Sequence, residues 1–121
     1  MVKILSLTTP YETSKLIEII ASEEIPAGTS LHTTKDSQEA REELEKRYYD
    51  IVIVSSFYKG IMSLVTNSCE RNIYTIILNG YTLSNLRETA EKAGAKIFSM
   101  TATEGIKNYI LDIINKQKNS N

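Results

Sequence analysis

The chain has few of the residues that form covalent cross-links and metal sites. Its 121 residues include one Cys, one His and no Trp, together with five Gly and two Pro. A single Cys excludes an internal disulfide and a cysteine-rich zinc site, and it is typical of a protein from a reducing compartment. The low Gly and Pro content, beside 41% hydrophobic residues, excludes collagen-like and disordered chains. The composition therefore predicts one ordered globular domain.

The chain also lacks long apolar runs and an excess of charge of one sign. No run approaches the roughly 18–20 apolar residues of a membrane span, and residues 1–9 are too polar for a signal peptide. Fourteen basic and fifteen acidic side chains give a net charge of −1, so we expect no overall basic surface for nucleic acid. We predict a cytoplasmic protein that contacts neither membrane nor nucleic acid directly.

Short apolar runs alternate with segments of helical periodicity. We interpret the runs as strands: Val2–Leu7, Ser30–Thr34, Ile51–Val54, Tyr74–Leu78 and Ala95–Phe98. Ile51–Val54 and Tyr74–Leu78 are rich in aliphatic and β-branched residues, as is typical of strands buried on both faces. Ser30–Thr34 is polar, which favours an edge strand. Between the runs, apolar residues recur at helical spacing, most clearly at Ile106, Tyr109, Ile110, Ile113 and Ile114.

Helix start and stop signals agree with this alternation. Capping boxes precede three of the expected helices, at Thr9–Glu12, Asp36–Glu39 and Thr101–Glu104. Pro26–Gly28 is expected to close the first helix and Gly94 the fourth. The sequence thus predicts five β-α units, whose strands pair in parallel because helices connect them. We expect one domain over residues 1–116 and a polar tail over residues 117–121.

Five β-α units in about 115 residues predict an α/β fold, the flavodoxin-like (βα)5 three-layer sandwich with a five-stranded parallel sheet of order 2-1-3-4-5. Three stretches add to this layout: the opening strand Val2–Leu7, the segment Tyr49–Val54 and the Ala-Gly-Ala turn Ala93–Ala95. Together, over residues 1–116, they resemble the framework of a receiver domain of bacterial two-component response regulators, of the chemotaxis-receiver type. In that family, the strand matching Tyr49–Val54 leads to the phosphorylated aspartate.

The chain departs from the receiver pattern at the positions that carry the chemistry. The acidic pair of a working receiver is replaced by Thr8 and Thr9, and the phospho-accepting Asp falls on Ser55. The Thr or Ser that ends the fourth strand is matched by Asn79, followed by Gly80, and the Lys that ends the fifth strand falls on Ser99 or Met100. The resemblance therefore implies a degenerate pseudo-receiver, which keeps the scaffold and lacks the phosphorylation chemistry.

The absence of phosphotransfer chemistry can also be argued from the residues without the family. In this topology ligands bind at the carboxyl ends of the strands, where Thr8, Thr9, Ser55, Ser56, Asn79 and Ser99 are expected. None of these is a carboxylate, and Mg²⁺ is usually held by one or two carboxylates. No Lys or Arg ends a strand to stabilise a phosphoryl group. We therefore predict no catalytic residue, no metal and no cofactor.

Several residues near this crevice allow two interpretations. Ser55 could accept phosphate only beside a base, and His32 lies on the polar edge strand. The hydroxyls either cap helices and strand ends or line a site for a small anionic ligand at helix N-termini. Glu12 is interpreted as a capping residue, and Cys69 as a small core hydrophobe.

These observations favour a phosphorylation-independent signalling or regulatory module that binds another protein. Receivers often signal through the face formed by the fourth helix, fifth strand and fifth helix, which here would hold Leu83, Arg87, Glu91, Lys96, Phe98, Lys107 and Tyr109. The partner would be a regulator, a kinase or an output protein, and a homodimer is also compatible with this surface. The alternative is a small-ligand sensor for a nucleotide or anion at the ends of the first and third strands. An enzyme of another flavodoxin-like family ranks last, because nucleophile–base pairs and paired carboxylates are missing from the strand ends.

Overall fold

The computed structural model describes residues 1–79 and 84–119, in which strands and helices alternate. The elements in chain order are β1 (Lys3–Leu7), α1 (Pro10–Ile20), β2 (Ser30–Thr33), α2 (Ser37–Lys46), β3 (Ile51–Ser55), α3 (Ile61–Glu70), β4 (Tyr74–Leu78), α4 (Ser84–Ala93), β5 (Lys96–Phe98) and α5 (Thr103–Asn119). Each strand end agrees with the sequence prediction to within one residue. The apolar runs were therefore sufficient to place the strands.

The strands form a single parallel sheet of order β2-β1-β3-β4-β5, which confirms the predicted flavodoxin-like fold. Every residue of the central strand β3 is buried, as its β-branched sequence predicts. β2 lies at one edge of the sheet and is largely exposed, which agrees with its polar sequence. The three-residue strand β5 forms the other edge.

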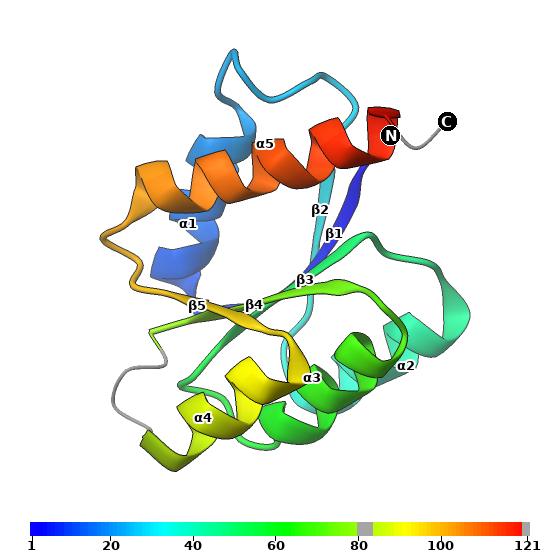
Figure 1. Ribbon diagram of the computed structural model, residues 1–121, viewed down its shortest axis with the longest axis vertical. Helices are drawn as coiled ribbons and strands as arrows, with labels where there is room; N and C mark the ends of the chain where they lie inside the picture. Colours follow the sequence, from blue (N-terminus) through cyan, green and yellow to red (C-terminus); the bar gives the residue numbers. More distant parts are fainter. Residues whose placement is uncertain (80–83, 120–121) are drawn as a thin grey trace.

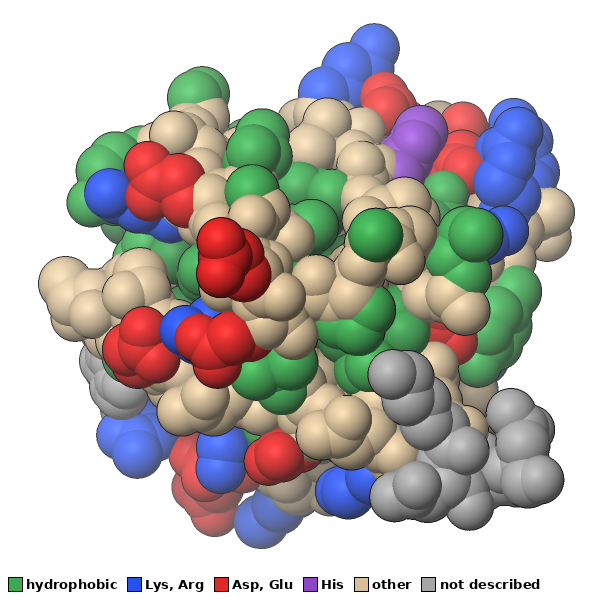
Figure 2. Space-filling view, turned by 90° about the horizontal axis from the view of Figure 1, so that it is seen from above, with side chains coloured by type: hydrophobic (Ala, Val, Ile, Leu, Met, Phe, Trp, Pro, Cys, Tyr) green, Lys and Arg blue, Asp and Glu red, His purple; other side chains and the backbone are tan. Residues whose placement is uncertain are grey.

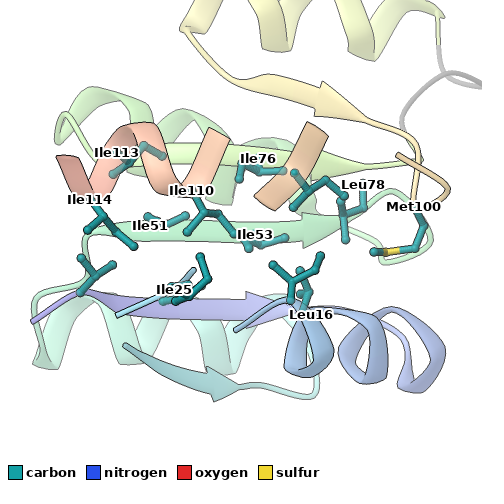
Figure 3. Close-up of a cluster of buried hydrophobic side chains, with 14 residues drawn as sticks. Leu16, Ile25, Ile51, Ile53, Ile76, Leu78, Met100, Ile110, Ile113 and Ile114 are labelled. Atoms are coloured by element: carbon teal, nitrogen blue, oxygen red, sulfur yellow. The ribbon is translucent and has the colours of Figure 1, made fainter. Parts of the chain in front are cut away.

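Helices cover both faces of the sheet and produce three layers. α1 and α5 lie on one face, and α2, α3 and α4 lie on the other (Figure 1). Successive residues of β3 alternate between the two sides: Ile51 and Ile53 belong to the core under α1 and α5, and Val52 and Val54 to the core under α2–α4. Figure 3 shows Ile51 and Ile53 of β3 in one buried cluster with Leu16 of α1 and Ile110 of α5. The two apolar layers thus hold the sheet from both sides.

Two of the predicted helix boundaries are wrong. α1 ends at Ile20 and does not continue to Pro26, because the chain turns back after Ala21 to bury Ile25 in the core. α5 begins at Thr103, one residue later than a cap at Thr101 predicts, since the Thr101 hydroxyl pairs with that of Ser99 at 2.8 Å. The prediction for α4 is confirmed, because this helix ends just before Gly94, whose φ is +108°.

Part of the segment expected as a polar tail is helical. Residues 117–119 continue α5, and the side-chain amide of Gln117 donates to Asp50 Oδ1 at 2.9 Å. The other Asp50 oxygen accepts the backbone N–H of Lys3 at 2.8 Å. These bonds join the end of α5 to the amino ends of β1 and β3, which explains why the helix outlasts its apolar stripe.

The outer surface carries charges of both signs. Figure 2 shows acidic and basic side chains spread over the side of the molecule that α5 covers, with hydrophobic side chains exposed among them. Within residues 1–79 and 84–119, no helix combines the length and apolarity that crossing a membrane requires.

Candidate functional site

The carboxyl ends of the strands meet in a polar crevice, as the topology predicts. Thr8 follows β1, Ser55 ends β3, Asn79 follows β4 and Ser99 follows β5. Thr8 is 6% exposed and Ser55 is fully buried. Of the predicted positions, Thr9, Ser55 and Asn79 therefore meet at one point, whereas the Thr8 hydroxyl pairs with that of Thr13 and the Ser99 hydroxyl with that of Thr101.

At the centre of the crevice lies a carboxylate that the sequence analysis assigned only to helix capping. Glu12 is 1% exposed, and its Oε1 accepts the backbone N–H and the hydroxyl of Thr9 at 2.9 and 3.0 Å. Its Oε2 accepts the hydroxyl of Ser55 at 3.1 Å and the amide Nδ2 of Asn79 at 2.7 Å. The predicted capping role of Glu12 is confirmed, and α1 in addition turns its side chain back over the strand ends, where it bonds to Ser55 and Asn79.

The capping box explains how Glu12 reaches this position. Thr9 caps α1, its side chain accepting the N–H of Glu12, and Pro10 occupies the first helical position. The reciprocal bond from the Thr9 N–H to the Glu12 carboxylate fixes the first turn of α1. The local motif thus sets the direction of the carboxylate, and the packing of α1 on the sheet places it against β3 and β4.

Asn79 connects the carboxylate to the loop after β5. Its Nδ2 donates to Glu12, and its Oδ1 accepts the backbone N–H of Met100 at 3.1 Å. Its backbone is fixed as well, since its N–H donates to the Phe98 carbonyl and its own carbonyl accepts the Ser56 hydroxyl. Asn79 has a φ of +60°, a left-handed conformation that Asn and Asp adopt more readily than other non-glycine residues. The side chain therefore bridges α1 and the β5–α5 loop through one amide group.

The hydrogen bonds use all the acceptor sites of the Glu12 carboxylate. An ionised carboxylate offers about four lone-pair sites, and Glu12 accepts four hydrogen bonds. Among the residues that the structure describes, no three His, Cys, Asp or Glu side chains gather in a group that could hold a metal. The carboxylate, Thr9, Ser55 and Asn79 thus form one connected hydrogen-bonding network.

A groove of about 540 Å³ lies beside the crevice, between α1 and the end of β2. Most of its exposed lining is apolar, and the residues around it include the hydroxyl-bearing Thr8, Thr13, Ser14, Thr33 and Thr34 beside Ile17 and Tyr58. The Tyr58 hydroxyl donates to the Thr8 carbonyl at 3.1 Å and ties the β3–α3 loop to the end of β1. No local sequence pattern indicates this groove, because its lining comes from three separate segments, residues 8–18, 33–34 and 58.

The predicted interaction face is only partly assembled. Phe98 and Tyr109 pack with ring centroids 5.7 Å apart, and on α4 Arg87 Nε lies 2.9 Å from Glu91 Oε1. Lys96 is exposed on the edge strand β5. Leu83 lies outside the described residues. Lys107 points elsewhere, as its ion pairs show.

Lys107 lies on the flank of α5 opposite Tyr109, because two residues along a helix turn it by about 200°. Its ammonium contacts Glu24 at 2.7 Å and Glu104 at 3.1 Å, and the hydrogen bonds that it donates to these carboxylates raise the pKa of Lys107. Glu24 belongs to the loop after α1. Lys107 therefore fastens that loop to α5, and the face reduces to Arg87, Glu91, Lys96, Phe98 and Tyr109.

His32 and Cys69, the two other residues considered in the sequence, both lie away from the Glu12 carboxylate. His32 is exposed on β2, with its ring centroid 6.3 Å from that of Tyr49. Cys69 packs half-buried against the core under α2–α4.

The chain matches no protein-family model, and no curated protein or solved structure is significantly similar to it.

Proposed function

We propose that the chain is a receiver-like regulatory module that acts through protein contacts and without phosphorylation. The observation that supports this proposal is the closed crevice: the buried Glu12 carboxylate accepts four hydrogen bonds at the point where a working receiver would need a free acidic pair and an acceptor. The single Cys is compatible with a cytoplasmic location. The resemblance to receivers suggests a regulatory function, and the hydrogen-bonded crevice suggests that this function does not use phosphorylation.

Ser55 is the residue whose chemistry could contradict this proposal. Glu12 Oε2 lies 3.1 Å from its hydroxyl, so the crevice does hold a base within hydrogen-bond reach, which the sequence analysis did not expect. Ser55 is nevertheless fully buried, and its oxygen also accepts the Phe57 N–H at 3.2 Å. A phosphoryl donor would need to displace both Glu12 and the β3–α3 loop before it could meet this hydroxyl.

A titration with Mg²⁺ and beryllofluoride, followed by amide NMR, tests the proposal. Beryllofluoride mimics a phosphoryl group on working receivers, and we expect no saturable shifts at the amides of Ser55, Asn79 and Ser99. The physical reason is the saturated carboxylate, which leaves the metal without a carboxylate ligand. Saturable shifts at these three amides would overturn the proposal and favour the ligand-sensor alternative.

The α4–β5–α5 face gives the proposal a second test. A partner recovered with the full chain can be titrated with wild type and with Arg87→Glu, which we expect to weaken binding by about tenfold or more. The melting temperature should change by less than about 2 °C, because the Arg87–Glu91 pair is half-exposed.

Lys92→Glu is the matched control for this substitution. Lys92 lies on the same helix and forms an equivalent ion pair with Glu88 at 3.2 Å. We therefore expect Lys92→Glu to lower the stability by a similar amount while it changes a different flank of α4. Equal binding by wild type and Arg87→Glu would exclude this face as the interface.

The groove beside the crevice supports the second candidate function, a small-ligand sensor. Its volume of about 540 Å³ and its mostly apolar lining with a few hydroxyl groups suit a small metabolite. A nucleotide or phosphorylated metabolite that raises the melting temperature would favour this function if Ser14→Trp, a substitution at the groove wall, abolishes the effect.

A further inference from the structure

The donors around Glu12 have the chemistry of an anion receptor. They comprise one backbone N–H, two hydroxyls and one amide, and they come from the start of α1, the end of β3 and the residue after β4. All four point at two oxygens that lie in a side chain 1% exposed. Buried donors without an acceptor are costly, so this set of donors requires an acceptor at that point, which the two carboxylate oxygens supply.

We propose that the crevice is a carboxylate-binding site whose ligand is supplied by the chain itself, as the side chain of Glu12. The site is therefore permanently occupied, and its donors are held in the anion-bound arrangement whatever anions the solution contains. This inference deepens the proposed function and rests on it, since an internal anion explains how the domain keeps one conformation without phosphorylation.

The position of the Glu12 carboxylate also affects two backbone amides outside the crevice, those of Met100 and Phe57. The Met100 N–H donates to Asn79 Oδ1 at 3.1 Å, and the Phe57 N–H donates to Ser55 Oγ at 3.2 Å. Asn79 and Ser55 are the two strand-end residues that donate to Glu12 Oε2. The amides of Met100 and Phe57 therefore report on the carboxylate from outside its own hydrogen bonds, in the β5–α5 and β3–α3 loops.

Truncating Glu12 to Ala removes a CH₂–COO⁻ group and leaves a space that matches acetate in size and charge. We expect acetate to bind Glu12→Ala saturably, with half-saturation of about 1–10 mM for so small a ligand. At about 100 mM it should raise the melting temperature of this variant by about 5 °C over chloride of equal ionic strength. The amide shifts of Met100 and Phe57 should move towards their wild-type values.

The controls separate a built site from a general effect of acetate. Wild type and Glu18→Ala, a surface carboxylate of the same helix that pairs with Lys15 at 3.6 Å, should show no saturable response. Acetamide, which has the shape of acetate and no charge, should not replace it. Inorganic phosphate distinguishes a receptor for carboxylates from one for any oxyanion, and a stronger response to phosphate than to acetate would overturn the carboxylate assignment.

Two further outcomes would also overturn the inference. One is a folded Glu12→Ala variant that gives no saturable response to acetate; the other is an equal response in Glu18→Ala. If Glu12→Ala does not fold in chloride, acetate should restore its circular dichroism, and a failure to do so counts against the site. Each of these results leaves the beryllofluoride titration of the wild type unaffected, so the inference and the proposed function can fail separately.

Discussion

Replacing Glu12 with Gln should lower the free energy of unfolding by about 2–4 kcal/mol, far more than a surface substitution does. Gln has nearly the same shape, and its Oε1 can still accept the Thr9 N–H. Its Nε2 then faces the Ser55 hydroxyl and the Asn79 amide, which are themselves donors to this position. Two charge-assisted hydrogen bonds are replaced by opposed donors in a site 1% exposed.

Urea unfolding measures this loss as a fall in the midpoint at an unchanged m-value. Glu18→Gln is the control, since Glu18 lies on the same helix and its ion pair is exposed, so its effect should stay within about 0.5 kcal/mol. A Glu12→Gln variant as stable as Glu18→Gln would mean that the network around the carboxylate contributes nothing to the fold.

The three layers of the fold could be predicted from the sequence because the residues of each strand indicate how far that strand is buried. The residues of Ile51–Ser55 are buried on both faces, and an unbroken β-branched run is sufficient to indicate that. The edge strand β2 was equally readable from its polar side chains. The end of α1 was not, because the turn at Ala21 depends on Ile25 reaching a core that forms only in three dimensions.

The role of Glu12 shows why the site was harder to predict than the fold. The capping box joins residues three apart and is visible in the sequence. The hydrogen bonds from Ser55 and Asn79 come from residues 43 and 67 positions further along the chain. The local sequence pattern is the same for a capping glutamate exposed to solvent and for one that is buried against the ends of two strands. A capping Glu at a helix that follows the first strand of this fold is a signal that could have been used, since that helix begins at the crevice.

Lys107 illustrates the same limit on the surface. Its place in the sequence, between apolar positions of α5, suggested a residue beside Tyr109 on one interaction face. The ion pair with Glu24 joins residues 83 positions apart and turns Lys107 to the other flank. Helical periodicity alone separates Lys107 from Tyr109 by about 200°, so this part of the assignment could have been made from the sequence.

Asn79→Asp should be more harmful than Glu12→Gln, and combining the two should restore much of the loss. The single substitution sets a second carboxylate where the amide now donates to Glu12 at 2.7 Å, so two like charges meet in a buried site and we expect a loss of about 3–5 kcal/mol. The backbone of residue 79 is no obstacle, because Asp tolerates the φ of +60° as Asn does.

In the double variant, Glu12→Gln with Asn79→Asp, the carboxylate and the amide of this hydrogen bond exchange positions. The amide introduced at position 12 donates to the carboxylate introduced at position 79, whose second oxygen can still accept the Met100 N–H that Asn79 Oδ1 accepts now. The two effects should therefore deviate from additivity by at least about 2 kcal/mol in the stabilising direction, measured as a double-mutant cycle in urea. If the losses simply add, the carboxylate and the amide act independently. The crevice would then lack the coupled network through which Glu12 is inferred to hold the loops.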